Sequence, residues 1–282
     1  MFDFDQELAR RYGAFASYQS DASPSSIECY GENPLNEVDR LLDHYTTPDS
    51  SVLDLGCGAG HTLCRLASHV KQIWGVDSNE ELLNAARLRT ERLGLTNVTM
   101  LLGSSNDPEA MKSLPDATFD FVFSRRGPNL SEHLLRALHK EAIFLQEVVS
   151  NLDGYSLGEI FGRRNYVPFS TVNQEALLST YADFGLFPVS CKEYFYEEFF
   201  RDSQHLAAFL TQVKPMLTPW LLPRSLPRKP YDPLYDQDAL DLYVRYNTTS
   251  KGIRILRQRK IFVLRRAVVT SYTADNTPPS HS

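Results

Sequence analysis

The sequence of 282 residues contains no apolar run of about 18 residues, so we expect no membrane-spanning helix. It begins with an acidic segment, Met1 to Asp5, where a secretory signal would be basic. None of its four cysteines belongs to a CxxC pair, which disfavours a zinc site and a disulfide framework. These absences predict a cytoplasmic protein with reduced cysteines, no metal and no membrane partner.

The chain is also short of positive charge, with 29 basic against 35 acidic residues and a net charge of −6. One segment departs from this balance, because residues 251–266 contain seven basic residues and no acidic one, leaving −13 on the remainder. The segment could bind RNA phosphate or could lie solvated along a sheet edge. Because phosphate contacts dominate nucleic-acid affinity and the body is acidic, we favour the second interpretation and do not expect a nucleic-acid partner.

The most informative segment is a buried strand at 52–55, followed by a glycine-rich turn at 56–60 and a helix that begins near His61. Without Cβ atoms, such a turn lets a ligand approach the main chain, and the helix start directs free N–H groups toward it. A dinucleotide-binding fingerprint would need glycine at position 61, so His61 disfavours a Rossmann dehydrogenase.

A second strand, 72–77, ends in Asp77, 21 residues after Gly56. A carboxylate at the tip of this strand can accept hydrogen bonds from both hydroxyls of a ribose. The glycine turn and the acid together therefore predict a nucleoside-containing ligand.

The pattern Asp54-Leu55-Gly56-x-Gly58-x-Gly60, with Asp77, resembles motif I of the class I S-adenosylmethionine (SAM)-dependent methyltransferases. The resemblance implies that the turn cradles the amino-acid end of SAM and that Asp54 interacts with its ammonium group. Ser104 stands where the family commonly has an acid near the adenine, and Ser105, Asn106 or Asp107 could replace it. The implied cofactor is SAM, with S-adenosylhomocysteine as product, bound by Asp54, Gly56, Cys57, Gly58, Gly60, Asp77, Ser78, Ser104, Ser105, Ser124 and Arg125.

Alternation of strands and helices from residue 51 onward predicts a doubly wound α/β fold. The resemblance implies seven mostly parallel strands, with an antiparallel last strand between the fifth and sixth. The remaining strands are expected at 98–102, 119–123, 142–149, within 187–199, and at 261–265. Helices are expected at 5–18, 36–45, 80–93, 131–139, 174–184, 205–213 and 236–246.

Five regions follow from this pattern. Residues 1–50 are predicted to be N-terminal helices over the cofactor site, and residues 51–201 to be the SAM-binding core. Residues 202–259 are predicted to form a helical cap insertion that selects the substrate, 260–269 the last strand, and 270–282 a disordered tail.

The loop after the fourth strand, 124–129, should face the reacting methyl group, because ligands bind beyond the carboxyl ends of parallel strands. Arg125 and Arg126 could hold an acidic acceptor there or could pair with surface carboxylates. No catalytic residue is assigned. Location alone makes four residues candidates for a general base: Glu132, His133, Glu147 and Tyr166. Tyr12, Tyr18 and Tyr30 could contact a ligand, although packing on the core is the interpretation we favour for them. The insertion could wall an apolar pocket with Phe209, Met216, Trp220, Leu221 and Leu222.

We therefore expect in-line methyl transfer from SAM to a small organic molecule, which would be acidic if the two arginines bind it. An RNA base methyltransferase and a SAM-binding module without turnover are the alternatives. The intact Asp54, Gly56, Gly58 and Asp77 favour an enzyme over the module. The sequence makes no prediction of oligomeric state.

Overall fold

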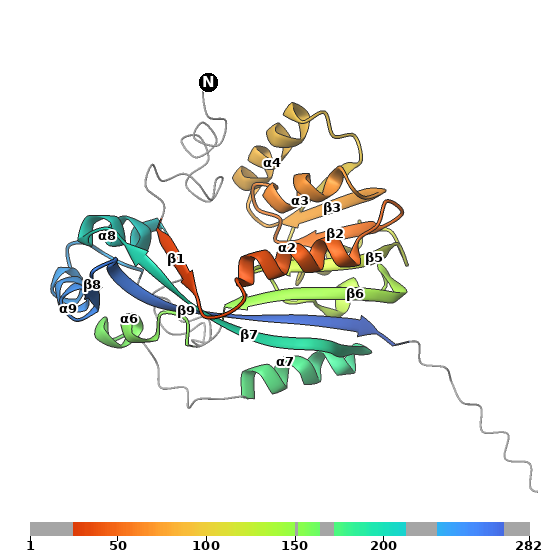
Figure 1. The fold of residues 1–282 in the computed structure, drawn as a ribbon. Helices are drawn as coiled ribbons and strands as arrows, with labels where there is room; N and C mark the ends of the chain where they lie inside the picture. The colour runs from red at the N-terminus through yellow and green to blue at the C-terminus, as the bar shows by residue number, and fades with distance from the viewer. Residues whose placement is uncertain (1–24, 150–151, 164–171, 213–229, 268–282) are drawn as a thin grey trace, which may run out of the picture.

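The computed structural model describes residues 25–149, 152–163, 172–212 and 230–267. They form a nine-stranded sheet in the order β1-β7-β9-β6-β5-β2-β3-β4, with β8 paired to β9 (Figure 1). The strands are β1 (Ser26–Cys29), β2 (Ser51–Leu55), β3 (Gln72–Asp77), β4 (Val98–Leu102), β5 (Phe119–Arg125), β6 (Leu138–Val149), β7 (Leu186–Phe200), β8 (Thr248–Thr249) and β9 (Gly252–Arg266).

Strands β2 to β6 are parallel, and β9 lies antiparallel between β6 and β7, as predicted for the last strand. The sheet has nine strands rather than seven because β1 pairs with β7 and β8 pairs with β9. Both added strands are short segments, of four and two residues, for which alternation of apolar and polar residues is a weak signal. The doubly wound α/β fold class is confirmed.

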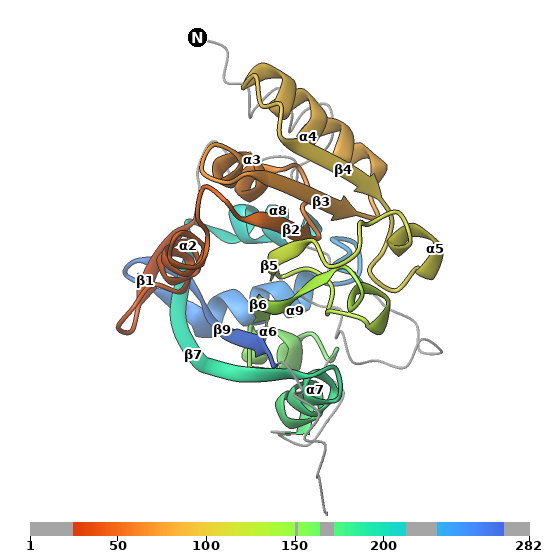
Figure 2. The same cartoon turned by 90° about the vertical axis from the view of Figure 1, so that its right-hand side faces the viewer.

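Helices cover both faces of the parallel strands (Figures 1 and 2). One face packs against α2, α3 and α4 through a cluster that includes Leu42, Leu63 and Phe123. The other packs against α5 and α7 through a cluster that includes Met111, Phe144 and Tyr181. The helices are α2 (Pro34–Tyr45), α3 (His61–Ala67), α4 (Glu80–Arg92), α5 (Pro108–Met111), α6 (Tyr155–Ile160), α7 (Val172–Asp183), α8 (Ser203–Gln212), α9 (Gln237–Asn247) and the short 3-10 helix η2 (Glu132–Leu134).

Strands β7 and β9 are each 15 residues long and extend beyond the end of β6. Their extensions, 195–200 and 252–258, carry a third apolar cluster with α6, α8 and α9, which includes Leu157, Phe200, Leu206 and Tyr243. We call these elements the cap lobe. Val149, at the carboxyl end of β6, pairs with Arg259, where this extension begins, so the carboxyl ends of the parallel strands face the cap lobe (Figure 1).

Three predictions about elements are wrong. A helix at 131–139 is replaced by η2 and by the start of β6 at Leu138, because the amides of Ala117 and Phe119 bond to the carbonyls of Arg136 and Ala137. The last strand begins at Gly252 rather than at 261, so the predicted boundary at 259/260 falls inside a continuous strand. Residues 1–50 are not purely helical, because β1 precedes α2.

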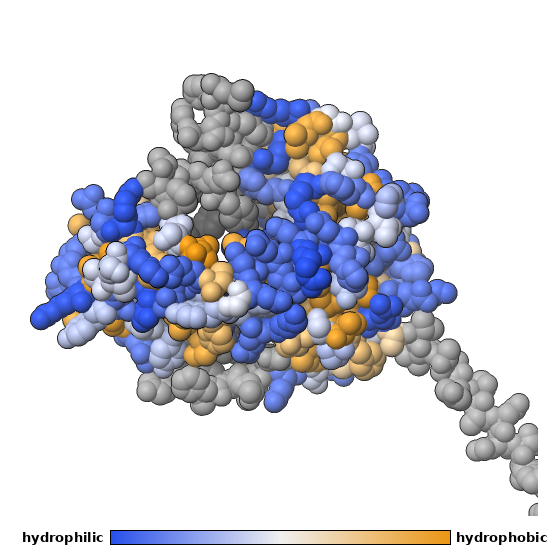
Figure 3. All heavy atoms as spheres, in the orientation of Figure 1, coloured by the Kyte–Doolittle hydropathy of each residue, from blue (hydrophilic) through white to orange (hydrophobic). Residues whose placement is uncertain are grey.

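Two further predictions, the helix at 5–18 and the disordered tail at 270–282, lie outside the described residues, as does most of the proline-rich part of the insertion. In the ranges that the structure describes, no helix is long and apolar enough to cross a membrane. The face seen in Figure 3 is mostly hydrophilic, with hydrophobic side chains in separate patches.

Candidate cofactor and acceptor site

The glycine turn has the geometry expected of a ligand cradle. Gly56, Gly58 and Gly60 have φ of 78°, 52° and 77°, in the left-handed region that disfavours residues with a Cβ. A Cβ at Gly56 would lie 2.8 Å from Pro128 Cδ, whereas one at Gly58 would meet no atom of the described residues within 4 Å. The turn is therefore pressed against the loop after β5 at Gly56 and open at Gly58, where a ligand can approach.

Asp54 is buried at the end of β2 with an exposed fraction of 3%. Burial raises the pKa of its carboxyl well above its usual range, an effect that the charge of Arg125 opposes and that of Asp77 reinforces. Within the described part of the chain this carboxylate accepts no hydrogen bond. A buried carboxylate in this condition is stabilised by a cationic ligand group, so Asp54 fits the ammonium group that the resemblance places beside it.

Asp77, the last residue of β3, is oriented by two main-chain amides. Its Oδ2 accepts a hydrogen bond from the Gly58 amide at 2.8 Å, and its Oδ1 accepts one from the Asn79 amide at 2.8 Å. The same carboxylate thus connects the glycine turn to the start of α4. Ser78 is exposed beside it, and Cys57 is buried beneath the turn, where burial raises the pKa of its thiol well above its usual value.

Some polar residues of the loop after β4 hold the loop in place, and others are accessible to a ligand. The Ser105 hydroxyl is buried and donates to the Asn129 carbonyl at 3.1 Å, and Asp107 caps α5 by accepting from the amides of Glu109 and Ala110. Ser104 is half-buried and Asn106 is exposed. Of the four residues considered for the adenine contact, Ser104 and Asn106 are the accessible ones, while Ser105 shapes the loop.

The loop after β5 joins the two halves of the site. The Ser124 hydroxyl is fully buried and donates to the Pro128 carbonyl at 2.8 Å, so this side chain faces the loop rather than a ligand. Gln146 holds the same loop from β6, because its Nε2 donates to Asn129 Oδ1 at 2.7 Å and its Oε1 accepts from the Tyr181 hydroxyl at 2.6 Å.

Arg125 is built into the interior rather than presented to a ligand. Its Nη1 donates to Asp39 Oδ1 at 3.0 Å and to Thr62 Oγ1 at 3.2 Å, and its Nε lies 3.5 Å from Glu147 Oε2. It therefore connects α2, the start of α3 and β6. No sequence pattern indicated Asp39 or Thr62 in this role, because the three segments meet only in the folded chain.

Glu147 lies at the carboxyl end of β6 with no side-chain exposure, and its oxygens lie 3.5 Å from Arg125 Nε, 3.8 Å from Arg126 Nε and 3.5 Å from Arg259 Nε. Enclosed by three guanidinium groups, it organises the arginines and is a poor candidate for a general base. The other two described candidates, Glu132 and His133, lie in η2, and Tyr166 lies outside the described residues.

Five of the seven basic residues in the segment 251–266 form ion pairs with carboxylates of the fold. Lys251, Arg254 and Lys260 form ion pairs with Glu28, Glu197 and Glu193. Two arginines are buried: Arg257 pairs with Asp153 and Glu198, and Arg259 with Asp153 and Glu147. Arg266 donates to the carbonyls of Leu135 and Leu138. The favoured interpretation, a solvated segment along a sheet edge, is wrong, because β9 lies inside the sheet between β6 and β7.

Two of the other predicted contact residues, Tyr30 and Phe209, lie within the described part of the chain. Tyr30 is 64% exposed at the end of β1, and Phe209 packs in the cap-lobe cluster. Tyr12, Tyr18, Met216, Trp220, Leu221 and Leu222 are outside the described residues. Among the residues described, no cluster of His, Cys, Asp or Glu could hold a metal ion.

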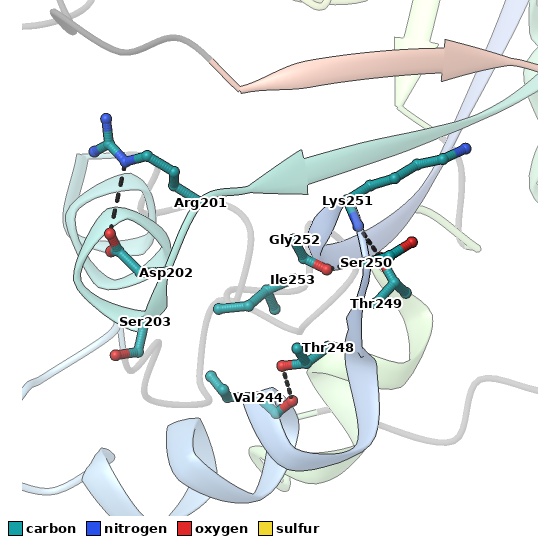
Figure 4. Close-up of a pocket in the computed structure, with 10 residues that line it drawn as sticks. All are labelled: Arg201, Asp202, Ser203, Val244, Thr248, Thr249, Ser250, Lys251, Gly252 and Ile253. Carbon is teal, nitrogen blue, oxygen red and sulfur yellow. Dashed lines mark hydrogen bonds and ion pairs between the residues drawn. The ribbon is translucent and has the colours of Figure 1, made fainter.

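A separate hollow of about 480 Å³ lies in the cap lobe, between the ends of α8 and β7 and the β8–β9 turn (Figure 4). Arg201, Ser203, Thr248 and Lys251 are among its lining residues, and none of the predicted cofactor-binding residues lines it. It is therefore distinct from the site at the glycine turn.

The strand order, the antiparallel β9 and the ligand cradle after β2 together define a Rossmann-like fold of the class I methyltransferase type. Residues 46–154 match a family model described as a methyltransferase domain. Over these residues, which make up less than half of the chain, the protein therefore resembles a methyltransferase domain.

Individual relatives are distant. A protein-L-isoaspartate O-methyltransferase of Nitrosococcus oceani is 33% identical over 105 residues, which cover 36% of this chain and 44% of that protein. The methyltransferase YcgJ of Bacillus subtilis, itself uncharacterized, is 28% identical over 96 residues, 34% of this chain and 36% of that protein. The chain thus spans less than half the length of both.

Solved structures extend the similarity of the fold to most of the chain. A protein of unknown function from Deinococcus radiodurans superposes with a TM-score of 0.58 at 18% identity, covering 93% of this chain and 98% of that one. The YcgJ structure superposes with a TM-score of 0.51 at 16% identity, covering 83% and 99%. At these identities the similarity concerns the fold alone.

Proposed function

We propose that the protein transfers the methyl group of SAM to a small organic molecule by in-line displacement. The observation that carries this proposal is the buried, hydrogen-bond-deficient carboxylate of Asp54 beside the open side of the glycine turn at Gly58. The buried carboxylate can pair with a cation, and the open turn leaves space for a ligand beside it. The amino-acid end of SAM, which carries an ammonium group, requires both. Asp77 adds a fixed carboxylate for the ribose.

When bound, SAM supplies a methyl group on a positively charged sulfur, which is already an activated electrophile. The chain needs only to bind and orient SAM and the acceptor and to exclude water from them. In this proposal the turn amides and Asp54 hold the amino-acid end, Asp77 holds the ribose, and the cap lobe, which the carboxyl ends of the strands face, closes the acceptor side. No general base is assigned, because a nucleophile that carries no proton needs none.

Pairing of the basic segment within the fold supports a small acceptor over RNA, because a protein that binds RNA needs cations directed toward phosphate. We place the reaction in the cytoplasm, where thiols such as Cys29 and Cys191 stay reduced.

Cofactor binding is tested by calorimetric titration of SAM and S-adenosylhomocysteine into the wild-type protein and Asp77→Ala. We expect wild-type binding, weakened by about 1–3 kcal/mol in the variant, because charge-assisted hydrogen bonds to the ribose are lost. Asp116→Ala, an exposed carboxylate remote from the turn, is the control and should bind as wild type. Absence of heat with the wild type at millimolar ligand would refute the assignment.

Turnover is tested by incubating the protein with SAM tritiated on its methyl group and either a metabolite extract or total RNA. We expect label in the small-molecule fraction. Label only in RNA would favour an RNA methyltransferase, and cofactor binding without label in either fraction would favour a module without turnover.

A further inference from the structure

We propose that the protein forms a symmetric dimer, in which β4 pairs antiparallel with β4 of a second copy and the two sheets become continuous. The inference goes beyond the proposed function and does not rest on it, because it concerns the edge of the sheet opposite β1 and not the cofactor turn. It names one occupant for that edge, a second copy of this chain.

The outer side of β4 is an open sheet edge. In the part of the chain that the structure describes, β4 pairs with β3, and no strand lies on its other side (Figure 2). Apolar side chains are exposed here: Leu102, the last residue of β4, is 46% exposed, and Leu93, which follows α4, is 58% exposed. An apolar edge with unpaired main-chain groups is a template on which a strand of another chain can pair.

The opposite edge of the sheet differs from β4, because its residues disfavour such pairing. β1 carries Glu28, and the part of β7 that extends past β1 carries Pro188 and Lys192 and has a register shift between Pro188 and Ser190. Charge, proline and an irregular register protect an edge from added strands. β4 has no charged residue and no proline, and its register with β3 is regular. Of the two edges, β4 is therefore the one suited to pairing.

The lack of charge around β4 favours a second copy as the partner. Residues 93–106 contain no charged side chain, although 23% of the chain is charged. A two-fold interface brings a surface against its own copy, so each charge near the axis meets an equal charge. A charged partner of another kind would instead be selected by complementary charges, which residues 93–106 do not offer.

Main-chain hydrogen bonds show which groups of β4 face the open edge. The Ile73 amide donates to the Asn97 carbonyl at 3.0 Å, and the Gly103 amide donates to the Asp77 carbonyl at 2.9 Å. Successive residues of a strand direct their N–H and C=O groups to opposite sides. The odd-numbered residues of β4 therefore bond toward β3, and the even-numbered ones direct these groups to the open edge.

The even-numbered residues define the register of the dimer. They are Val98, Met100 and Leu102, and Met100 is the central residue of the strand. An antiparallel pair centred there opposes Met100 to the partner's Met100 and Val98 to the partner's Leu102. Each is a hydrogen-bonded pair, in which the two residues exchange both N–H···O bonds. This register satisfies every main-chain group that β4 directs outward, and the apolar side chains of the pairs meet on one face of the joined sheet.

The first measurement is sedimentation velocity of the full chain, without cofactor and under reducing conditions, over about 1–200 μM, a range that covers a weak dimer. We expect the wild type to shift from monomer to dimer within this range. A wild type that stays monomeric throughout would overturn the inference. An assembly larger than a dimer would also overturn it, because pairing through β4 closes with two copies.

Met100 provides the decisive variants, because the two-fold axis opposes this residue to itself. Met100→Lys and Met100→Glu keep an unbranched side chain, and each brings two like charges together, so each should weaken the dimer about 100-fold. A mixture of the two variants opposes lysine to glutamate and should restore dimers. Leu234→Lys, at an 87% exposed position before α9, adds the same charge elsewhere and should dimerise as the wild type does.

Leu102→Pro tests the main chain without adding charge. It removes an outward N–H from a residue that is 46% exposed, so the pairing with β3 is retained and the dimer should weaken about 10–100-fold. Met100 variants that dimerise as strongly as the wild type, or a mixture that dimerises no better than either alone, would contradict this register. If circular dichroism showed the Met100 variants to be unfolded, Leu102→Pro would decide, and unchanged dimerisation of that variant would overturn the inference.

Discussion

Asp54 carries a buried carboxyl group whose cost in stability accompanies its proposed role in binding SAM. Its carboxylate lies at the end of a fully buried strand, and burial raises its pKa. Between the ordinary pKa and the raised one, the folded protein keeps a proton that the unfolded chain has lost. Stability therefore falls as pH rises through this window. A cationic ligand group would offset this cost by pairing with the carboxylate.

Asp54→Asn should therefore raise stability and reduce binding. Removal of a buried charge should raise the Tm near neutral pH by about 2–8 °C. The gain should shrink toward acidic pH, where the wild-type carboxyl is protonated. Affinity for SAM should fall by about 1–3 kcal/mol through loss of a charged partner. Scanning calorimetry across this pH range and titration with SAM measure the two effects, and a lower Tm for the variant near neutral pH would contradict the argument.

At the scale of elements, a buried ionic cluster fixes the connection between β6 and α6 to β9. Asp153 accepts from Arg257 Nε at 2.9 Å, Arg259 Nη1 at 2.7 Å and the Gln258 amide at 2.9 Å. Burial opposes ionisation of this carboxyl, but the charges of Arg257 and Arg259 outweigh it, so its pKa is lowered. The cluster lies where the cap lobe leaves the core.

Breaking this cluster should be costly. Asp153→Asn leaves two buried guanidinium groups without their shared carboxylate and should destabilise the protein by about 3–5 kcal/mol. The wild-type pKa is lowered, so this contribution is complete above the ordinary pKa of an aspartate and is lost as pH falls through the lowered one. Chemical denaturation at neutral and acidic pH should therefore show a narrowing difference between variant and wild type.

The exposed Asp116→Asn serves as the control for that comparison and should change stability by no more than about 0.5 kcal/mol. A variant Asp153→Asn that unfolds at the same denaturant concentration as wild type would show that the cluster contributes no net stability. The role of the cluster would then be limited to orienting the side chains of Arg257 and Arg259.

At the scale of the whole molecule, the described fold closes just after β9. The Ala267 amide donates to the Gly185 carbonyl at 2.9 Å, which ties the end of β9 to the start of β7. Residues 270–282 lie beyond this bond and carry no pattern of apolar residues that could add to a core.

Deletion of residues 270–282 should leave the Tm and the affinity for SAM unchanged, because no core-forming pattern is removed. Thermal unfolding of the truncated chain beside the full chain measures this. A decrease of several degrees would show that the segment packs on the fold.

The parallel core and the residues of the candidate cofactor site could be predicted from local sequence patterns. The strand at 51–55, the glycine turn and Asp77 are local features, close together along the chain, and they need only the neighbouring strand to take up their geometry. The antiparallel orientation of the last strand was predicted from the resemblance to the methyltransferase family and not from the residues of that strand.

The contacts of the residues on the proposed acceptor side of the site could be learned only from the tertiary structure. Whether Arg125 meets a ligand or Asp39 depends on how α2 docks, and whether seven basic residues face solvent or carboxylates depends on the register between β7 and β9. Residues 131–139 have the apolar spacing of a helix, but the amides of Ala117 and Phe119 bond to the carbonyls of Arg136 and Ala137, and the segment forms η2, a turn and the start of β6. These outcomes rest on contacts between residues far apart in the chain, which no local pattern records.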